Sequence, residues 1–462
     1  MSLLFKNGRL VTTEEVNKRD ILIEDEKIKA IKENFDPEEI SKECQIIDLK
    51  EKYVFPGIID SHTHYHIKSP EITTADDFYS GTVSAAFGGV TTFIDYSDQI
   101  KGHSLFEAIR NRQEEAEGET VIDFSLHQIV YSLYSQIKEE LKQLKENNII
   151  NSLKVITTYK KYGVMLEEEN WEKLFKVARD LKLLVTVHAE DNKLIEKIKD
   201  GYQNCNTFPP YFHPILRPPE TEYRAILEVG NLANLLDMPV YIVHLSSKKG
   251  YNAIKEIKRR GGNIFVETTP HYLLLTNDLL KKKKAQKYFM TPPLREGEDN
   301  EALWLGIKNK DINVIATDHC AFTIEQKLST NNCLEILAGI PGSETLLPLI
   351  YTAGVKSGRF DVKTLVALLS TNPAKIFGLY PQKGSLNPGT DADIVVFDQD
   401  KKVIISDLQQ HSAAGYTAYA GMEVTGYPVI TILRGNVIVK DDIFYGEKGM
   451  GKFVKAKESI LY

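Results

Sequence analysis

Residues 54–64 read Val54-Phe55-Pro56-Gly57-Ile58-Ile59-Asp60-Ser61-His62-Thr63-His64, an apolar run that ends in polar side chains. The β-branched and aromatic residues of this run predict a buried strand, Val54–Asp60. Residues two apart on an extended segment face the same way, so His62 and His64 can approach one ion together. A strand that ends in potential metal ligands is typical of an α/β fold whose site lies at the carboxyl ends of its strands.

The same pattern repeats through the middle of the chain: a short β-branched run, a polar turn, and a stretch with helical periodicity. Eight such strands alternating with helices predict an α/β fold of the (β/α)8 TIM-barrel type. The predicted strands are Val54–Asp60, Val90–Tyr96, Val121–Leu126, Leu153–Thr158, Leu183–His188, Val240–His244, Asn263–Thr268 and Asn313–Thr317. The predicted helices include Ala75–Phe87, Glu168–Leu181, Glu220–Leu236, Gly250–Arg260, Asn300–Lys308, Gly342–Lys356 and Val362–Phe377.

Both ends of the chain carry short alternating strands with no helix between them. These strands are Leu3–Val11, Ile21–Ile31, Ala392–Asp398 and Val429–Val439. Neither end has enough residues for a core of its own, so we expect both to pair in one small composite β-sandwich domain. The predicted organisation is a composite β domain of residues 1–52 and 385–445, a barrel of residues 53–384, and a C-terminal tail of residues 446–462, extended or serving as an oligomer arm.

Composition and charge exclude several classes of partner. The 462 residues are 42% hydrophobic and 26% charged, as in ordinary globular proteins, and 57 basic against 64 acidic residues give a net charge of −7. This balance argues against nucleic acid or an anionic membrane as a partner. The chain has no long apolar run and no secretion signal, and its four cysteines lack the spacing of a zinc or redox motif. We therefore expect a cytoplasmic protein with reduced cysteines.

Three more predicted strands end in potential ligands: His188, His244 and Asp318. For any one of these residues, a hydrogen-bonded core histidine or a helix-capping aspartate is a sufficient explanation. Agreement among four strands favours a shared role, because the strand ends of a barrel meet at one mouth. Imidazoles with a carboxylate suit zinc or a similar divalent ion.

The fourth predicted strand has a lysine, Lys154, inside an apolar run. A buried, unpaired ammonium is costly. Lys154 must therefore extend to solvent, lose its proton, pair with a carboxylate or be modified.

Ten segments carry a resemblance to a known family. They are Pro56–His64, Asp76–Thr82, Lys154–Tyr159, Val187–Glu190, Arg217–Glu220, Val243–Ser246, Glu267–Tyr272, Pro292–Arg295, Thr317–Cys320 and Gly389–Asp393. Together they resemble the cyclic amidohydrolases of the urease-like superfamily, most closely the dihydropyrimidinase/hydantoinase family. The resemblance extends over nearly the whole chain.

This resemblance implies a centre of two divalent metal ions, with zinc expected and manganese or cobalt as alternatives. The implied ligands are His62, His64 and Asp318 on one ion, His188 and His244 on the other, and Lys154, carboxylated to N6-carboxylysine, bridging both.

The resemblance also implies the reaction and the residues that serve it. A small cyclic ureide or imide, a dihydropyrimidine or a hydantoin, is hydrolysed at its ring amide to an N-carbamoyl amino acid. Asp318 and Tyr159 are the implied catalytic residues, and Tyr159, Thr291 and Ala338 contact the ring. The family also implies a homotetramer or a homodimer.

Departures from the family pattern keep other substrates open. Tyr65-His66-Ile67-Lys68 replaces the usual loop after His64, Ala338 stands where hydantoinases have asparagine, and Ala321 replaces a proline after Cys320. Dihydroorotases have an arginine at the position of His66, so dihydroorotase is disfavoured, whereas allantoinase stays open. A non-catalytic scaffold homologue is disfavoured because all six ligand positions are filled.

Overall fold

In the computed structural model, which describes residues 2–68 and 72–460, eight parallel strands form one curled sheet whose order follows the chain. A bridge between Thr63 and His319, in which the His64 N–H donates to the His319 carbonyl at 2.8 Å, joins the first strand to the last. The predicted (β/α)8 barrel is confirmed. Its strands are β6 Ile58–Asp60, β7 Val90–Ser97, β8 Asp123–Ile129, β9 Ser152–Ile156, β10 Leu184–His188, β11 Val240–Ile242, β12 Ile264–Thr268 and β13 Val314–Ile315.

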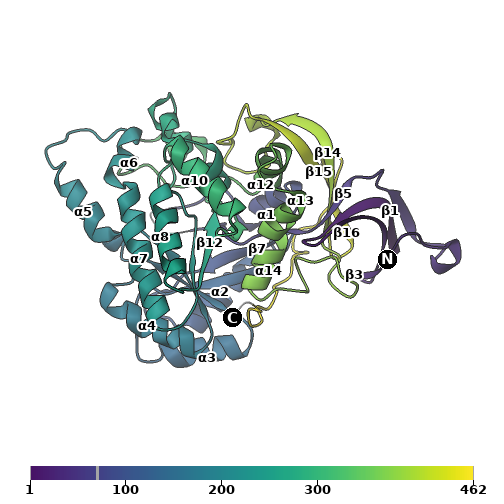
Figure 1. Cartoon of the computed structure of the whole chain (residues 1–462), viewed down its shortest axis with the longest axis horizontal. Coiled ribbons are helices and arrows are strands. Elements are labelled where there is room, and N and C mark those ends of the chain that lie inside the picture. The colour runs from purple at the N-terminus through teal and green to yellow at the C-terminus, as the bar shows by residue number, and fades with distance from the viewer. Residues whose placement is uncertain (1, 69–71, 461–462) are drawn as a thin grey trace.

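Helices surround the barrel, and Figure 1 shows α4, α7 and α8 along one flank. Helix α8 buries Tyr251, Ile254 and Ile257, whose spacing places them on one face. The helices are α1 Phe78–Phe87, α2 Leu105–Ala116, α3 Ile137–Glu146, α4 Glu168–Asp180, α5 Asn192–Asp200, α6 His213–Leu216, α7 Pro219–Leu235, α8 Lys248–Arg259, α9 Pro270–Leu274, α10 Gly297–Lys308, α11 Ile324–Leu328, α12 Leu346–Ile350, α13 Val362–Val366 and α14 Asn372–Ile376.

Two groups of helices differ in detail from the sequence prediction. Helix α1 begins at Phe78 instead of Ala75, because the Asp77 side chain accepts the Ser80 N–H and caps the helix. Near the end of the barrel, α12 continues into a π-helical turn, Tyr351–Lys356, and a second such turn, Ala367–Thr371, joins α13 to α14. None of the helices in the described ranges combines the length and apolar character needed to span a bilayer.

The predicted strand Val54–Asp60 is two strands that belong to different sheets. Strand β5 (Tyr53–Pro56) pairs with β1 and β14 of the composite sheet, whereas β6 pairs with β7 of the barrel. Gly57 lies between them, and a Cβ there would meet the Thr91 hydroxyl oxygen at 2.0 Å. The apolar run did not reveal this change of sheet because both strands are buried.

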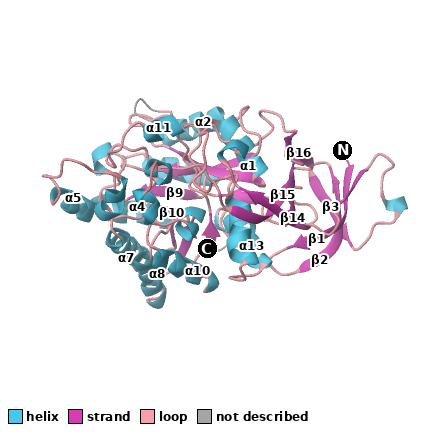
Figure 2. Cartoon of the chain, turned by 90° about the horizontal axis from the view of Figure 1, so that it is seen from above, coloured by secondary structure: helices cyan, strands magenta, loops and turns pink. Residues whose placement is uncertain are grey.

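The composite β domain forms from both ends of the chain, as predicted, and β5 joins the two halves by pairing with β1 and β14. Figure 2 shows this sheet at one end of the molecule and the barrel at the other. The domain limits given above stay a prediction. They assign β5 to the barrel, whereas strand pairing places it in the composite sheet. Its strands are β1 Ser2–Val11, β2 Val16–Glu24, β3 Lys27–Lys32, β4 Gln45–Asp48, β5, β14 Ile394–Ile404, β15 Glu423–Leu433, β16 Asn436–Lys440 and β17 Ile443–Phe444.

The C-terminal segment crosses from the composite sheet onto the barrel. The Val454 N–H donates to the Phe124 carbonyl at 2.7 Å, and the Lys457 N–H donates to the Gly378 carbonyl at 3.0 Å. The described part of the predicted tail therefore lies against the barrel of its own chain. Residues 461 and 462 of that tail lie outside the described residues.

A buried ion cluster fixes the barrel to the composite sheet. The Lys383 Nζ donates to Asp123 at 2.5 Å, Asp393 at 2.6 Å and Asp391 at 2.9 Å, and Arg434 also pairs with Asp123. Asp123 begins a barrel strand, whereas Asp391 and Asp393 precede β14. The three carboxylates lie close enough to suggest a metal site, but the lysine ammonium lies among them.

Candidate metal centre at the carboxyl end of the barrel

The six predicted ligands lie on five barrel strands or directly after them. His62 and His64 follow β6, Lys154 lies in β9, His188 ends β10, His244 follows β11, and Asp318 follows β13. Because the carboxyl ends of parallel barrel strands meet at one mouth, this placement brings side chains from distant parts of the sequence together.

The first group of predicted ligands converges on one carboxylate oxygen. The Nε2 atoms of His62 and His64 each lie 3.2 Å from Asp318 Oδ1. Although burial opposes it, the two imidazoles hold the pKa of Asp318 well below its usual range. Asp318 is therefore ionised, as a metal ligand must be.

The second group is a pair of histidines that face each other. His188 Nδ1 and His244 Nε2 are 2.9 Å apart, and the other ring nitrogen of His188 lies 2.9 Å from Glu190 Oε2. Within the described ranges, the buried Nδ1 of His244 has no hydrogen-bond partner. Burial lowers the pKa of both histidines, so two neutral imidazoles, the form that binds metals, point their nitrogens at one another.

Lys154 is only 3% exposed and has no ion pair with any residue that the structure describes. Its Nζ lies 5.1 Å from the centre of the Tyr96 ring, and the same ring packs against His62 and His64 at centroid distances of 5.0 and 4.8 Å. Burial lowers the pKa of Lys154 to about 8. The amine therefore lies near the histidines, where Glu267 and Asp318 favour its charged form without forming an ion pair with it.

Sequence reasoning assigned no role to Glu267, which organises the centre from behind. Its Oε1 accepts from His62 Nδ1 at 2.7 Å and from the His244 N–H at 3.1 Å, and its Oε2 accepts from the Tyr241 hydroxyl at 2.8 Å. A carboxylate on Nδ1 fixes the imidazole tautomer and leaves Nε2 free to bind a metal. Burial raises the pKa of Glu267 to about 8. Its signal in the sequence was a glutamate at the end of an apolar strand.

The predicted ring-contacting residues lie on loops beside this centre. Tyr159 lies under the Arg217 guanidinium at 4.7 Å, with its ring 5.6 Å from that of His188, and shares a side-chain hydrogen bond with Thr291. Burial raises the pKa of Tyr159 to about 12, so its hydroxyl stays a donor. Ala338 is half-buried on another loop. In that loop the Gly339 N–H donates to the Phe289 carbonyl at 2.9 Å.

The divergent loop after His64 turns its aromatic side chain into the core. Tyr65 is fully buried, and its hydroxyl lies 2.7 Å from the Ser343 hydroxyl oxygen. The His66 ring stacks on Phe78 at a centroid distance of 5.3 Å. The side chain at the position of the dihydroorotase arginine is therefore packed against an aromatic ring.

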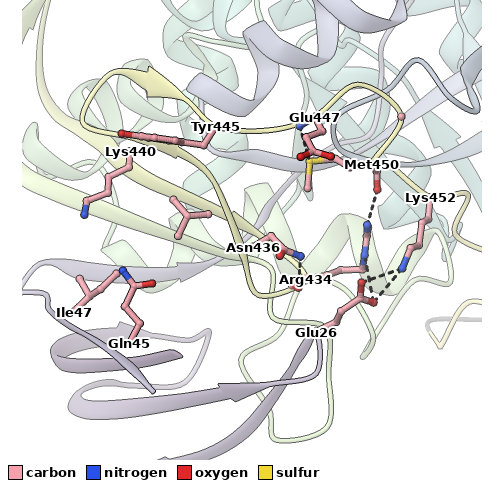
Figure 3. A pocket seen from close by; sticks show the side chains of 12 residues that line it. Glu26, Gln45, Ile47, Arg434, Asn436, Lys440, Tyr445, Glu447, Met450 and Lys452 are labelled. Carbon is pink, nitrogen blue, oxygen red and sulfur yellow. Dashed lines mark hydrogen bonds and ion pairs between the residues drawn. The ribbon is translucent and has the colours of Figure 1, made fainter. Parts of the chain in front are cut away.

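A pocket of about 730 Å³ lies elsewhere, between β4, β16 and the C-terminal segment. Figure 3 shows Arg434 and Lys452 turned toward Glu26, and Lys452 pairs with Glu26 at 3.1 Å. None of the candidate site residues lines it, and three of its charged groups, Glu26, Arg434 and Lys452, pair with one another. We therefore place the site at the barrel mouth.

The barrel and the histidines and aspartate at its strand ends define a metal-dependent hydrolase. Within that class, the chain belongs to the amidohydrolase family, whose profile matches residues 53–438. It is 36% identical over 460 residues to a D-hydantoinase of Geobacillus stearothermophilus, and the alignment covers 98% of this chain and 96% of the relative. A D-hydantoinase of Ralstonia pickettii is 35% identical over 99% of both chains. The crystal structure of dihydropyrimidinase from Brevibacillus agri superimposes with a TM-score of 0.95 at 34% identity, covering 99% of each chain.

Proposed function

We propose that the chain hydrolyses the ring amide of a dihydropyrimidine or a hydantoin and releases an N-carbamoyl amino acid. The observation that carries this proposal is the convergence of His62, His64 and Asp318 beside the facing pair His188 and His244. The relatives named D-hydantoinase and dihydropyrimidinase, matched over nearly the full chain, support this class of ring.

The residues present fit a pair of divalent ions. His62, His64 and Asp318 would hold one ion, and His188 and His244 the other. The unpartnered Nδ1 of His244 and the mixture of neutral imidazoles with an ionised carboxylate favour zinc, with manganese or cobalt as alternatives. Ions bound there supply a water of lowered pKa and polarise the ring carbonyl.

Carboxylated Lys154 completes the proposed ligand set. An uncharged amine adds to carbon dioxide, forming a nitrogen–carbon bond and losing a proton, and the carbamate product has two anionic oxygens. Burial lowers the pKa of Lys154 to about 8, although Glu267 and Asp318 oppose the shift, so a fraction of the uncharged amine is present near neutral pH. The oxygens of the carbamate would serve as ligands to both ions, and its negative charge would offset part of theirs.

Asp318 and Tyr159 carry out the proposed proton transfer and charge stabilisation. As water adds to the carbonyl carbon, the Asp318 carboxylate accepts its proton and delivers it to the ring nitrogen, whose bond to carbon then breaks. The Tyr159 hydroxyl donates to the oxygen that gains negative charge. A pKa of about 12 keeps this hydroxyl protonated throughout the neutral range.

The test is kcat/KM for hydantoin, dihydrouracil, allantoin and dihydroorotate at equal metal loading. Hydantoin or dihydrouracil is expected to lead. Dihydroorotate is expected to be poor, because a ring carboxylate would not find an arginine at the position of His66. A lead of about tenfold by allantoin or dihydroorotate, about 1.4 kcal/mol, would contradict the assignment.

Cytoplasmic location and assembly as a homotetramer or homodimer are part of the same proposal, and the assembly rests on the family resemblance. Size-exclusion chromatography with light scattering tests the assembly, and a monomer at micromolar concentration would contradict it.

A further inference from the structure

A buried lysine outside the metal centre holds two loop segments together. Lys327 lies in the short helix α11 and is completely buried. Its Nζ donates to three main-chain oxygens: Phe289 at 2.8 Å, Leu337 at 2.6 Å and Gly339 at 2.9 Å. Although burial lowers the pKa of Lys327 to about 7, three acceptor oxygens match the three N–H donors of its ammonium form.

The contacts of Lys327 are unusual for a buried charge. Within residues 2–68 and 72–460 it has no carboxylate within ion-pair distance, so main-chain carbonyl dipoles are its principal compensation. A buried cation must be paired or fully hydrogen-bonded to be tolerated. The arrangement therefore ties the main chain at Phe289 to that at Leu337 and Gly339.

These tied segments carry Thr291 and Ala338. A trans peptide is planar, so the N–H of Ala338 points away from the Leu337 carbonyl, and therefore away from Lys327. In the part of the chain that the structure describes, this N–H has no acceptor, and the main-chain N–H and carbonyl of Thr291 have no partner. Unpaired main-chain groups of this kind can bind the alternating carbonyl and N–H edge of a cyclic imide.

The two segments are not held equally well. The Thr291 segment is also held by His213, whose Nε2 lies 3.0 Å from the Met290 carbonyl oxygen and 3.1 Å from the Thr291 hydroxyl. The Ala338 segment has the Lys327 contacts, the bond from the Gly339 N–H to the Phe289 carbonyl and, at Ile340, a bond from the Cys320 N–H at 3.2 Å, but no side chain other than Lys327 bonds to its main chain at Leu337 or Gly339 in the described structure. Loss of Lys327 should therefore release Ala338 more than Thr291.

We propose that Lys327 is a positioning residue for the substrate ring, which fixes the main-chain edges of Thr291 and Ala338 and so sets the affinity for cyclic imides. It does so without contact with the metal ligands. This inference rests on the proposed function, because that function supplies the ring.

The experiment compares Lys327→Met, which keeps the apolar stem and removes the donors, with the exposed control Lys281→Met. KM and kcat are measured for hydantoin, together with binding of a cyclic imide, inhibition by a metal-directed hydroxamate, and metal content. For Lys327→Met we expect KM and the imide Kd to rise about tenfold, the scale of a lost hydrogen bond. Hydroxamate inhibition and metal content should stay unchanged, and Lys281→Met should match the wild type.

Imide binding that is unchanged in Lys327→Met, or a loss that falls equally on the hydroxamate and the metals, would overturn the proposal. If Lys327→Met does not fold, Ala338→Pro removes the same N–H donor and leaves the lysine. Wild-type imide affinity in Ala338→Pro would equally overturn it. If the proposed function is wrong, the wild-type protein will open none of the rings. Binding of the cyclic imide, compared between the wild type and Lys327→Met, tests the role of Lys327 separately.

Discussion

Two buried lysines of this barrel meet opposite electrostatic surroundings. Lys383, 1% exposed at the junction with the composite sheet, has three carboxylates within 2.9 Å, which raise its pKa above the usual value although burial opposes this. Lys154, 3% exposed at the strand ends, has no such partner in the described structure, and burial lowers its pKa to about 8. The first cluster is internally compensated and stabilises the fold. The second has no ion pair of its own, and a carbamate that binds metal ions would remove the positive charge of this lysine.

Among the substitutions that test this comparison, Lys154→Ala should have the largest effect on metal content and activity. Without the bridging carbamate, the centre should lose at least one metal ion and nearly all ring-opening activity, because both ions depend on that ligand. Metal analysis and steady-state kinetics on the purified variant check this. Partial rescue by short carboxylic acids is expected, since they can replace the missing carbamate. Full activity and full metal content in Lys154→Ala would remove the distinction between the two lysines.

Asp318→Asn keeps the shape of the side chain and removes its basicity. We expect kcat to fall by roughly 10²–10⁴, the usual contribution of general acid–base catalysis. The measurement is kcat with the metal content of each preparation determined in parallel. Near wild-type turnover at equal metal loading would show that another group moves the proton.

Lys383→Met tests the compensated cluster and should act on stability alone. Asp123 keeps Arg434 and Asp391 keeps Lys27, but Asp393 loses its cation, and a buried charge left unpaired typically costs about 3–5 kcal/mol. The denaturant midpoint should fall, while metal content and kcat of the folded enzyme should stay close to the wild type. A change in metal stoichiometry with an unchanged midpoint would reverse the roles assigned to the two clusters.

Glu267→Gln should have the smallest effect of the four. The amide keeps its size, but its single oxygen cannot accept from both His62 Nδ1 and the Tyr241 hydroxyl. Loss of such a partner typically lowers metal affinity by about 10- to 100-fold. Competition with a chelator measures this, and an unchanged affinity would mean that Glu267 serves only the Tyr241 hydroxyl.

Much of the fold could be predicted from the sequence, because β-branched runs alternating with helical periodicity specify the barrel directly. The change of sheet at Gly57 could not, since β5 and β6 are both buried and read as one apolar run. The start of α1 at Phe78 depended on which of several polar residues supplied the cap, and periodicity does not resolve this.

The candidate ligands could be predicted for a similar reason: strand ends are visible in a sequence, and barrel strand ends converge. Residues that act through contact across the barrel could not. Glu267 contacts His62, which is 205 residues away, and Lys327 contacts Phe289, which is 38 residues away. No local sequence pattern predicts these contacts.

Elemental analysis of the purified wild-type chain tests the central claim most directly. We predict two divalent ions per chain, with ring-opening activity that disappears when a strong chelator removes them and returns when zinc or manganese is added back. A chain that opens hydantoin or dihydrouracil at full rate with no bound divalent ion, before and after chelation, would contradict the account.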